Sequence, residues 1–267
     1  PIFFSLNSET LPNMLDSWIA LIAFSMQIYF DFSGYSDMAI GLALCFGIYL
    51  PDNFLSPYKS TSFREFWKRW HITLSKFLRD HIYIPLGGNK KNNQSTIFNI
   101  SITMILGGLW HGASWNFIVW GGYHGLLLVM ERILKYFLKP SLTTSLSKPF
   151  FVSLIFLFIT LGWVPFKCNS LENTLTMIKI LFSFETYHIL KQVNLIEPVL
   201  LILISLSVVW FFPNTSLIKS YIINMVNKNK LSITSLLIFS TISLVIVLGI
   251  LSDPVQQIDR EFIYFQF

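Results

Sequence analysis

The sequence predicts an all-α membrane protein, a bundle of helices that crosses the bilayer several times. Of its 267 residues, 53% are hydrophobic and only 12% are charged, which is about half the charged fraction of a soluble domain. Apolar runs recur along the chain, and several approach the roughly 20 residues that a helix needs to cross a bilayer. These runs lie at about 18–30, 38–50, 97–110, 116–130, 150–166, 196–212 and 233–252.

The basic residues predict how these spans are oriented. They cluster in 59–91, 132–148 and 219–230, and the positive-inside rule assigns such segments to the cytoplasmic side. The spans between the clusters then alternate without conflict, and the tail, 253–267, faces the outside. Because the positive charge of the chain is explained by topology, we expect the lipid bilayer, and not nucleic acid, as its partner.

The start of the chain predicts that more of the protein precedes it. The first residue is Pro1 rather than Met, and no signal-peptide pattern follows it. No internal repeat and no soluble domain stand out. We therefore expect residues 1–267 to form the C-terminal portion of a single membrane domain whose first spans are missing.

The segment 62–82 differs from the expected spans. Its apolar side chains recur at i, i+3, i+4 and i+7 and so form one helical face, while the charged residues fall on the opposite arc. This pattern is typical of an interfacial helix with snorkelling basic side chains. His71 lies at the boundary between the two faces, so a special role for it stays open.

"GGLWHGASW", residues 107–115, places a histidine in a stretch that is otherwise lipid-like. Ionisable residues inside a membrane are expensive and often functional. Glycines around His111 allow close backbone approach, and Trp110 and Trp115 are expected to wall the position. A neutral imidazole there can accept a proton from a hydroxyl. The alternative is a buried structural histidine that hydrogen-bonds a carbonyl group.

The other polar residues of the expected spans favour structural roles. His124 is neither three nor four residues from His111, and carboxylates near the histidines are too few for a zinc site, so we predict no metal. His124 is expected to pack or to support other residues. Asp31 and Asp37 frame a Ser/Gly-rich break and are expected to line a polar tunnel or to pair with basic residues of 62–82.

Several motifs taken together, in chain order, resemble the membrane-bound O-acyltransferase family. The sequence is most similar to the branch of alginate O-acetylation proteins and peptidoglycan O-acetyltransferases, and the match runs from about residue 18 to the C-terminus. The motifs are "YFDFSGYSDMAIGLA", "FWKRWHITLSKFLRDHIYIPLGGNK", "GGLWHGASWNFIVWGGYHGLLL", "LGWVPF" and "FIYFQF".

The resemblance implies roles for three residues. The histidine of the W-H-G motif, here His111, is the family's principal catalytic residue, and that of R-W-H, here His71, is its partner. They meet only if the region around His71 folds into the bundle as a re-entrant segment. The tyrosine of the terminal F-x-Y-F-Q-F motif, here Tyr264, is implicated as an acyl carrier. On the residues alone, an anchor at the membrane interface is the simpler interpretation of Tyr264.

The resemblance also implies the reaction. The expected donor is cytoplasmic acetyl-CoA, with no bound cofactor, and its phosphates would meet basic residues at the mouth of a tunnel, among them Arg64, Lys68 and Arg69. The expected acceptor is a hydroxyl of an envelope polysaccharide of the alginate or peptidoglycan type. We expect an SGNH-type secreted or periplasmic transferase as partner and the bacterial inner membrane as location.

Two other classes of function remain open on the sequence. The first is a transporter or flippase of acyl or glycan intermediates, with the two histidines and the two aspartates along its path. The second is a scaffold that only recruits a secreted transferase. The ordered motifs favour the enzyme over both.

Overall fold

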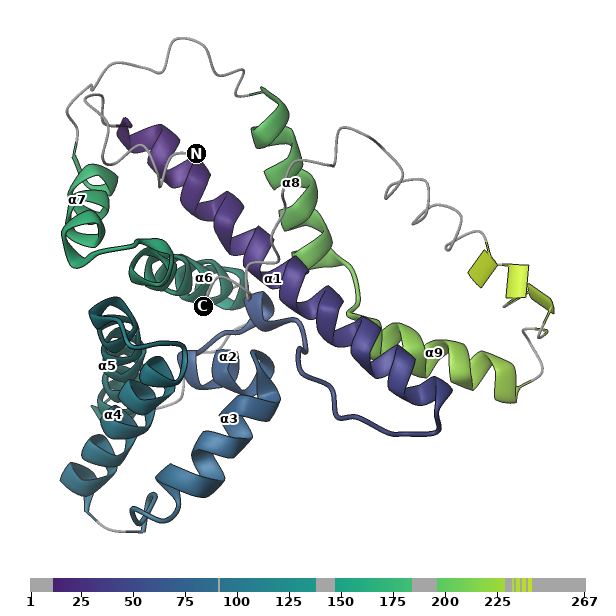
Figure 1. Ribbon diagram of the computed structural model, residues 1–267, viewed down its shortest axis with the longest axis horizontal. Coiled ribbons are helices and arrows are strands. Elements are labelled where there is room, and N and C mark those ends of the chain that lie inside the picture. Colours follow the sequence, from purple (N-terminus) through teal and green to yellow (C-terminus); the bar gives the residue numbers. More distant parts are fainter. Residues whose placement is uncertain are drawn as a thin grey trace. The chain divides into compact units, whose positions relative to one another are not determined.

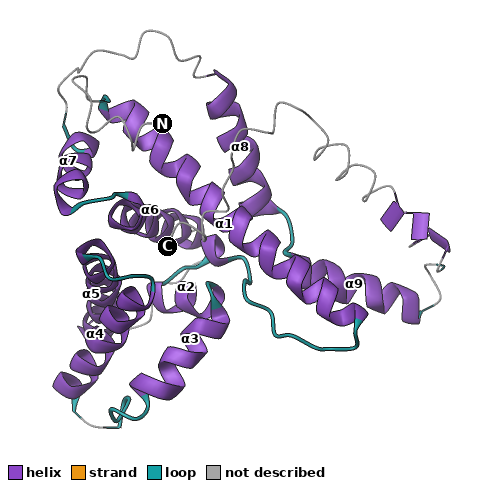
Figure 2. Ribbon diagram, in the orientation of Figure 1, coloured by secondary structure: helices purple, strands orange, loops and turns teal. Residues whose placement is uncertain are grey.

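The computed structural model describes residues 12–90, 92–137, 147–183 and 196–228, with a few positions between 232 and 241. Helices make up all regular structure in these residues, as the sequence predicts (Figures 1 and 2). The chain divides into two units, Pro1–Phe212 and Pro213–Phe267. The helices of the first unit are α1 (Met14–Cys45), η2 (Pro57–Lys59), α2 (Phe63–Arg69), α3 (Ile72–Leu78), η3 (Arg79–Tyr83), α4 (Asn93–Trp110), α5 (Trp115–Phe137), α6 (Ser147–Lys167), α7 (Leu171–Leu181) and α8 (Ile196–Phe211), and α9 (Thr215–Asn227) lies in the second unit.

Helix α1 is continuous through a region where the sequence suggested a break. The apolar run at 18–30 and the first part of the run at 38–50 belong to one helix of 32 residues, which ends at Cys45. Asn13 begins it, and its side chain accepts the Asp16 amide proton at 2.8 Å. The Ser and Gly residues between the runs cost at most about 1 kcal/mol each in a helix. Packing of the N-terminal half against α6, α7 and α8 outweighs that cost.

The segment 62–82 is not a single interfacial helix, so that prediction is wrong. Helix α2 ends at Arg69 and α3 begins at Ile72, because His71 adopts a left-handed conformation with φ 42° and ψ 57°. The neighbouring loop supplies replacements for the helical hydrogen bonds that are lost at this break. The Leu55 amide donates to the Arg69 carbonyl, and the Ile72 amide donates to the Asn53 carbonyl, each at 3.0 Å.

This break lets the apolar face of the segment enter the bundle. Phe66, Trp70, Leu74 and Leu78 are buried, as the helical spacing predicts, whereas Phe77 is 53% exposed. Periodicity identified most of the buried side chains correctly. It could not reveal a two-residue break, because the groups that stabilise the break come from another part of the chain.

Helices α4 and α5 lie side by side (Figure 1), joined by the short segment after His111. Their backbones approach so closely that only glycine fits at the contact. A Cβ atom added to Gly108 would lie 2.1 Å from the Phe117 carbonyl oxygen, and one added to Gly121 would lie 2.3 Å from the Met104 carbonyl oxygen. Small residues at such contacts are typical of membrane helix pairs.

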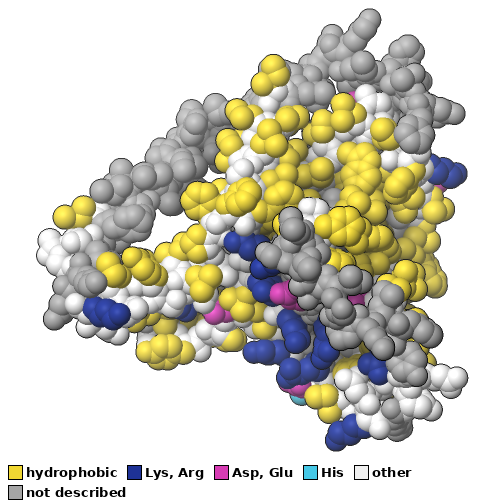
Figure 3. Space-filling model, turned by 180° about the vertical axis from the view of Figure 1, so that it is seen from behind, with side chains coloured by type: hydrophobic (Ala, Val, Ile, Leu, Met, Phe, Trp, Pro, Cys, Tyr) yellow, Lys and Arg dark blue, Asp and Glu magenta, His cyan; other side chains and the backbone are white. Residues whose placement is uncertain are grey.

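Two of the described helices are long and apolar enough to cross a membrane alone. Their spans are Trp115–Lys135 in α5 and Lys148–Lys167 in α6, while Pro198–Phe211 and Thr215–Asn227 qualify only as one broken span. Hydrophobic side chains cover much of the surface seen in Figure 3, and Lys and Arg side chains gather in one area of it. Most of the expected span at 233–252 lies outside the described residues.

Candidate functional site

His111 is the C-cap residue of α4, and its backbone N–H donates to the carbonyl groups of the preceding turn. Its side chain is buried, with 7% of the residue exposed. Aromatic rings from three helices surround the imidazole, with centroid distances between 5.1 and 6.1 Å. These rings belong to Trp110, Phe117, Trp120 and Phe166.

The wall around His111 differs from the expected one in one residue. Trp110 contacts the imidazole as expected, but Trp115, at the first position of α5, is 70% exposed. Trp120 and Phe166 close the site in its place. Trp120 lies about 140° from Trp115 around α5, so it faces the bundle when Trp115 faces outward. Phe166 comes from α6, and no local signal places it there.

His71 lies between α2 and α3, and polar contacts hold its ring on one side. Its Nδ1 atom is 3.2 Å from Oδ1 of Asn53. Thr73 donates to the same Asn53 oxygen through its amide, at 3.2 Å, and through its hydroxyl, at 2.9 Å. Sequence analysis missed Asn53, because nothing in its local pattern connects it with a histidine 18 residues away.

The structure brings both histidines against the same indole. The ring centroid of Trp110 is 6.1 Å from that of His71 and 5.1 Å from that of His111. The His71 ring also packs edge-on against Phe32 of α1, at 4.7 Å. Residues far apart in the sequence therefore form one cluster, which depends on the left-handed turn at His71.

His124 lies on α5, one helical turn after Trp120, and is 1% exposed. Neither of its ring nitrogens has a hydrogen-bond partner among the described residues. Its ring is 5.0 Å from Trp120 and 5.2 Å from Trp67, with Phe66, Tyr123 and Trp163 also in contact. This setting is that of a side chain packed among aromatic rings.

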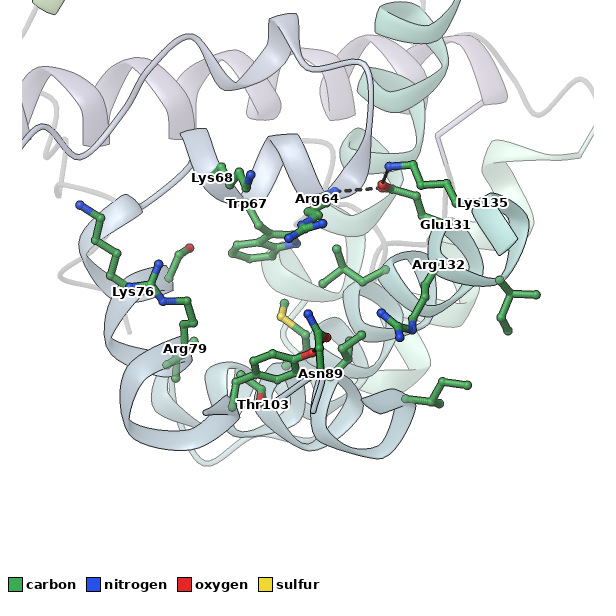
Figure 4. Close-up of a pocket in the computed structure, with 18 of the residues that line it drawn as sticks. Arg64, Trp67, Lys68, Lys76, Arg79, Asn89, Thr103, Glu131, Arg132 and Lys135 are labelled. Atoms are coloured by element: carbon green, nitrogen blue, oxygen red, sulfur yellow. Dashed lines mark hydrogen bonds and ion pairs between the residues drawn. The ribbon is translucent and has the colours of Figure 1, made fainter. Parts of the chain in front are cut away.

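A cavity of about 1040 Å³ opens between α2, α3, α4 and α5, at the upper end of the range for small-molecule sites. Basic side chains gather around it, and the indole of Trp67 also lines it (Figure 4). One carboxylate, Glu131, accepts the Arg64 amide proton at 2.9 Å and pairs with Lys135. The basic lining residues are Arg64, Lys68, Lys76, Arg79, Arg132 and Lys135.

Arg64 and Lys68 line this cavity, as the expected site for donor phosphates requires, but Arg69 does not. Its guanidinium group pairs with Glu65 at 2.7 Å and donates to the Leu55 carbonyl at 3.1 Å. Burial raises the pKa of Glu65, but hydrogen bonds from Thr61 and the charge of Arg69 outweigh it, so the pKa lies below its usual value. Arg69 therefore stabilises the end of α2.

Of the remaining candidate residues, the structure describes Asp31 and Asp37 but not Tyr264. Asp31 and Asp37 lie within the continuous helix α1, partly buried and about 120° apart around its axis. Tyr264 lies outside the described residues. Among the described residues, no group of three or more His, Cys, Asp and Glu side chains is arranged to hold a metal ion.

The fold and the site define a helical membrane protein with two histidines at one aromatic cluster beside a basic cavity. Residues 5–171 match the sequence model of the membrane-bound O-acyltransferase family, which is more than half of the chain. The chain therefore belongs to this family.

Relatives with assigned names narrow the similarity to one branch. The chain is 47% identical over 173 residues to a probable alginate O-acetylase of Azotobacter vinelandii, covering 65% of this chain and 34% of the relative. The corresponding protein of Pseudomonas aeruginosa is 45% identical over 186 residues, covering 69% and 35%. A peptidoglycan O-acetyltransferase of Helicobacter pylori is 43% identical over 182 residues, covering 66% and 33%. The chain thus spans about a third of the length of these relatives.

Proposed function

We propose that this chain holds the catalytic histidines of a membrane O-acetyltransferase that transfers an acetyl group from cytoplasmic acetyl-CoA to a hydroxyl acceptor, for O-acetylation of an envelope polysaccharide. The observation that supports this most directly is the meeting of His71 and His111 at Trp110, next to a basic cavity. The names of the relatives, which refer to alginate and peptidoglycan, support the acceptor class.

His111 is the general base in this proposal. Its imidazole accepts the proton of the acceptor hydroxyl, and the hydroxyl oxygen attacks the thioester carbonyl. The carbon–sulfur bond breaks, the thiolate leaves, and the imidazolium of His111 returns the proton to the sulfur. His71 orients the reacting groups beside it. The thioester supplies the free energy, so the reaction consumes no ATP.

The cavity is the proposed entrance for the donor. Acetyl-CoA is strongly anionic, and the cationic lining of the cavity favours its phosphates. Trp67 and Leu78 line the cavity and also contact residues around His111. The ring centroids of Trp67 and Trp120 are 5.8 Å apart, and Leu78 packs against Gly107. The arm of the donor must move one of these side chains aside to bring its thioester to His111.

The finer parts of the proposal concern the full-length protein. It would lie in the bacterial inner membrane with its C-terminus on the outer face. The acyl group would leave on the polysaccharide, on Tyr264 or on an SGNH-type partner in the periplasm. An acyl-tyrosine at position 264 would be found by mass spectrometry of the C-terminal peptide after incubation with acetyl-CoA.

The experiment that tests the function compares three strains of the native host at equal membrane abundance of the full-length protein. They produce the wild type, His111→Ala and His81→Ala, the last being a matched histidine at an exposed position of η3. Base-labile acetate is then measured on purified envelope polysaccharides. We expect acetate to be lost only with His111→Ala. Normal acetate in that strain would contradict the proposal and favour a transporter.

A further inference from the structure

Asn53, in the loop between α1 and η2, is the polar centre of the break that holds His71. Its Oδ1 atom faces the Thr73 amide, the Thr73 hydroxyl and Nδ1 of His71. Its Nδ2 group donates to Oγ of Ser36 at 3.2 Å. Its backbone carbonyl accepts the amide proton of Ile72 at 3.0 Å. One residue therefore fixes both the backbone and the ring of His71.

These contacts determine which ring nitrogen of His71 carries the proton. A backbone N–H can only donate, so the Thr73 amide establishes that the side-chain oxygen of Asn53, and not its nitrogen, faces this group. An amide oxygen can only accept, so Nδ1 of His71 donates to it at 3.2 Å. The Thr73 hydroxyl also lies 3.4 Å from Nδ1, but its shorter contact, at 2.9 Å, is with the Asn53 oxygen, to which it donates. In a neutral imidazole the proton then resides on Nδ1, and Nε2 keeps its lone pair.

The backbone of His71 needs such support. Its φ of 42° lies in the left-handed region, where the Cβ atom of a residue with a side chain crowds the following carbonyl oxygen. Strained conformations persist where the surroundings over-determine them. Asn53 does so here, because it binds the backbone on one side of His71 and the ring itself.

We propose that Asn53 is a positioning residue for acyl transfer, which holds His71 so that Nε2 is its hydrogen-bond acceptor. The proposal rests on the proposed function and deepens it. A neutral His71 in this state accepts a hydrogen bond from a hydroxyl group and cannot donate one through Nε2 to a developing oxyanion. His71 therefore orients the acceptor hydroxyl or the protonated imidazole of His111, and oxyanion stabilisation falls to other groups.

The test measures O-acetyl transfer from acetyl-CoA by the full-length protein in native membranes. Asn53→Leu removes the oxygen, and we expect kcat to fall about 10- to 100-fold, the usual effect of losing a group that orients a functional histidine. The KM for acetyl-CoA should stay within about twofold, since Asn53 does not line the cavity. Asn53→Asp keeps an oxygen acceptor for Nδ1, but its carboxylate favours the charged imidazolium of His71, in which Nε2 is a donor. The kcat of this variant should therefore rise towards the wild-type value as the pH is raised, whereas that of Asn53→Leu should stay low at every pH.

Two further variants separate positioning from mere folding. Ser36→Ala removes only the partner of the Asn53 Nδ2 group and should leave kcat nearly unchanged. In a His71→Ala background, Asn53→Leu should cost nothing more, because the residue that it positions is gone. Membrane abundance and the unfolding temperature are measured for every variant.

The possible results distinguish the two proposals. An active wild type whose Asn53→Leu variant is fully active, or loses as much kcat in the His71→Ala background as alone, would overturn the role of Asn53. A kcat of Asn53→Asp that stays as low as that of Asn53→Leu at every pH would overturn it too. A wild type that forms no acetyl ester would overturn the proposed function and, with it, this inference.

Discussion

Two buried histidines lie against the same indole, that of Trp120, and their surroundings differ. The ring centroid of His111, at the end of α4, is 5.1 Å from that of Trp120, and His71 shares the contact with Trp110. His124 is 5.0 Å from the Trp120 ring, in the middle of α5, with both nitrogens unpartnered among the described residues. Burial in an aromatic cluster is therefore common to both histidines. Position at a helix end, against an indole shared with a second imidazole, distinguishes His111 from His124.

The largest expected effect comes from substituting His111 and His124 separately. His111→Gln should lower the rate of acetyl transfer by about 10²- to 10⁴-fold, the usual contribution of a general base. His124→Leu should keep the rate within about fivefold, because it replaces an unpartnered polar ring with an apolar side chain of similar size. Both rates are measured on purified full-length protein with acetyl-CoA. Similar losses in the two variants would remove the distinction between the histidines.

The contact between α4 and α5 holds both histidines at Trp120, and two glycines test it. Gly108→Ala forces a methyl group against the Phe117 carbonyl, which should destabilise the protein by at least about 1–3 kcal/mol. Gly122→Ala, on the same helix pair, meets no atom within 4 Å and should be neutral or stabilising by roughly 0.5–1 kcal/mol. The yield of folded protein and its unfolding temperature measure both effects. Equal stability of the two variants would mean that this contact is looser than the structure has it.

The cavity provides a further test, because the affinity for a donor bound there should depend on the basic residues that line it. Arg64→Ala and Lys68→Ala should each raise the KM for acetyl-CoA about tenfold, the equivalent of one charge-assisted hydrogen bond, with less effect at high salt. Arg69→Ala should leave KM unchanged and lower the unfolding temperature. Steady-state kinetics at two salt concentrations provide the measurement. A KM that responds to Arg69 but not to Arg64 would place the donor elsewhere.

The smallest expected effect concerns Glu65, which supports the helix that carries Phe66 and Trp67 over His124. Its pKa is depressed in the folded protein, so its stabilisation is present above the unfolded value, about 4.5, and is lost as the pH falls through the folded value. At pH 7, Glu65→Gln should cost roughly 0.3–1 kcal/mol, the range of exposed ion pairs.

Thermal unfolding of the wild type and Glu65→Gln between pH 7 and about pH 3 checks this prediction, because the loss occurs below about pH 4.5. The difference between the two should shrink as the pH falls. A difference that stays constant would show that Glu65 acts through packing and not through its charge.

Local patterns predicted the helical class and most of the helices, because apolar runs and buried faces are properties of neighbouring residues. They failed where distant residues decide. The break at His71 depends on Asn53 and Leu55, from a loop before α2. The helices α7 and α9 were not predicted, and the break expected in α1 is absent.

The candidate site follows the same division. The motifs pointed to His71 and His111 and to basic residues near the cavity, of which Arg64 and Lys68 line it. The wall formed by Phe166 and the hydrogen bond that Asn53 accepts from His71 arise only when α6 and the α1–η2 loop fold against the two histidines. Sequence spacing contains no record of those approaches.

We propose that His71 and His111 serve the same step of acetyl transfer, and a double-mutant cycle tests this directly. Acetyl transfer is measured for full-length wild type, His71→Ala, His111→Ala and the double variant, all at equal amounts of folded protein. Residues that serve one step are strongly non-additive. We expect the double variant to be about as slow as His111→Ala alone. A double variant whose loss is the product of the two single losses would contradict it, because the two histidines would then act independently.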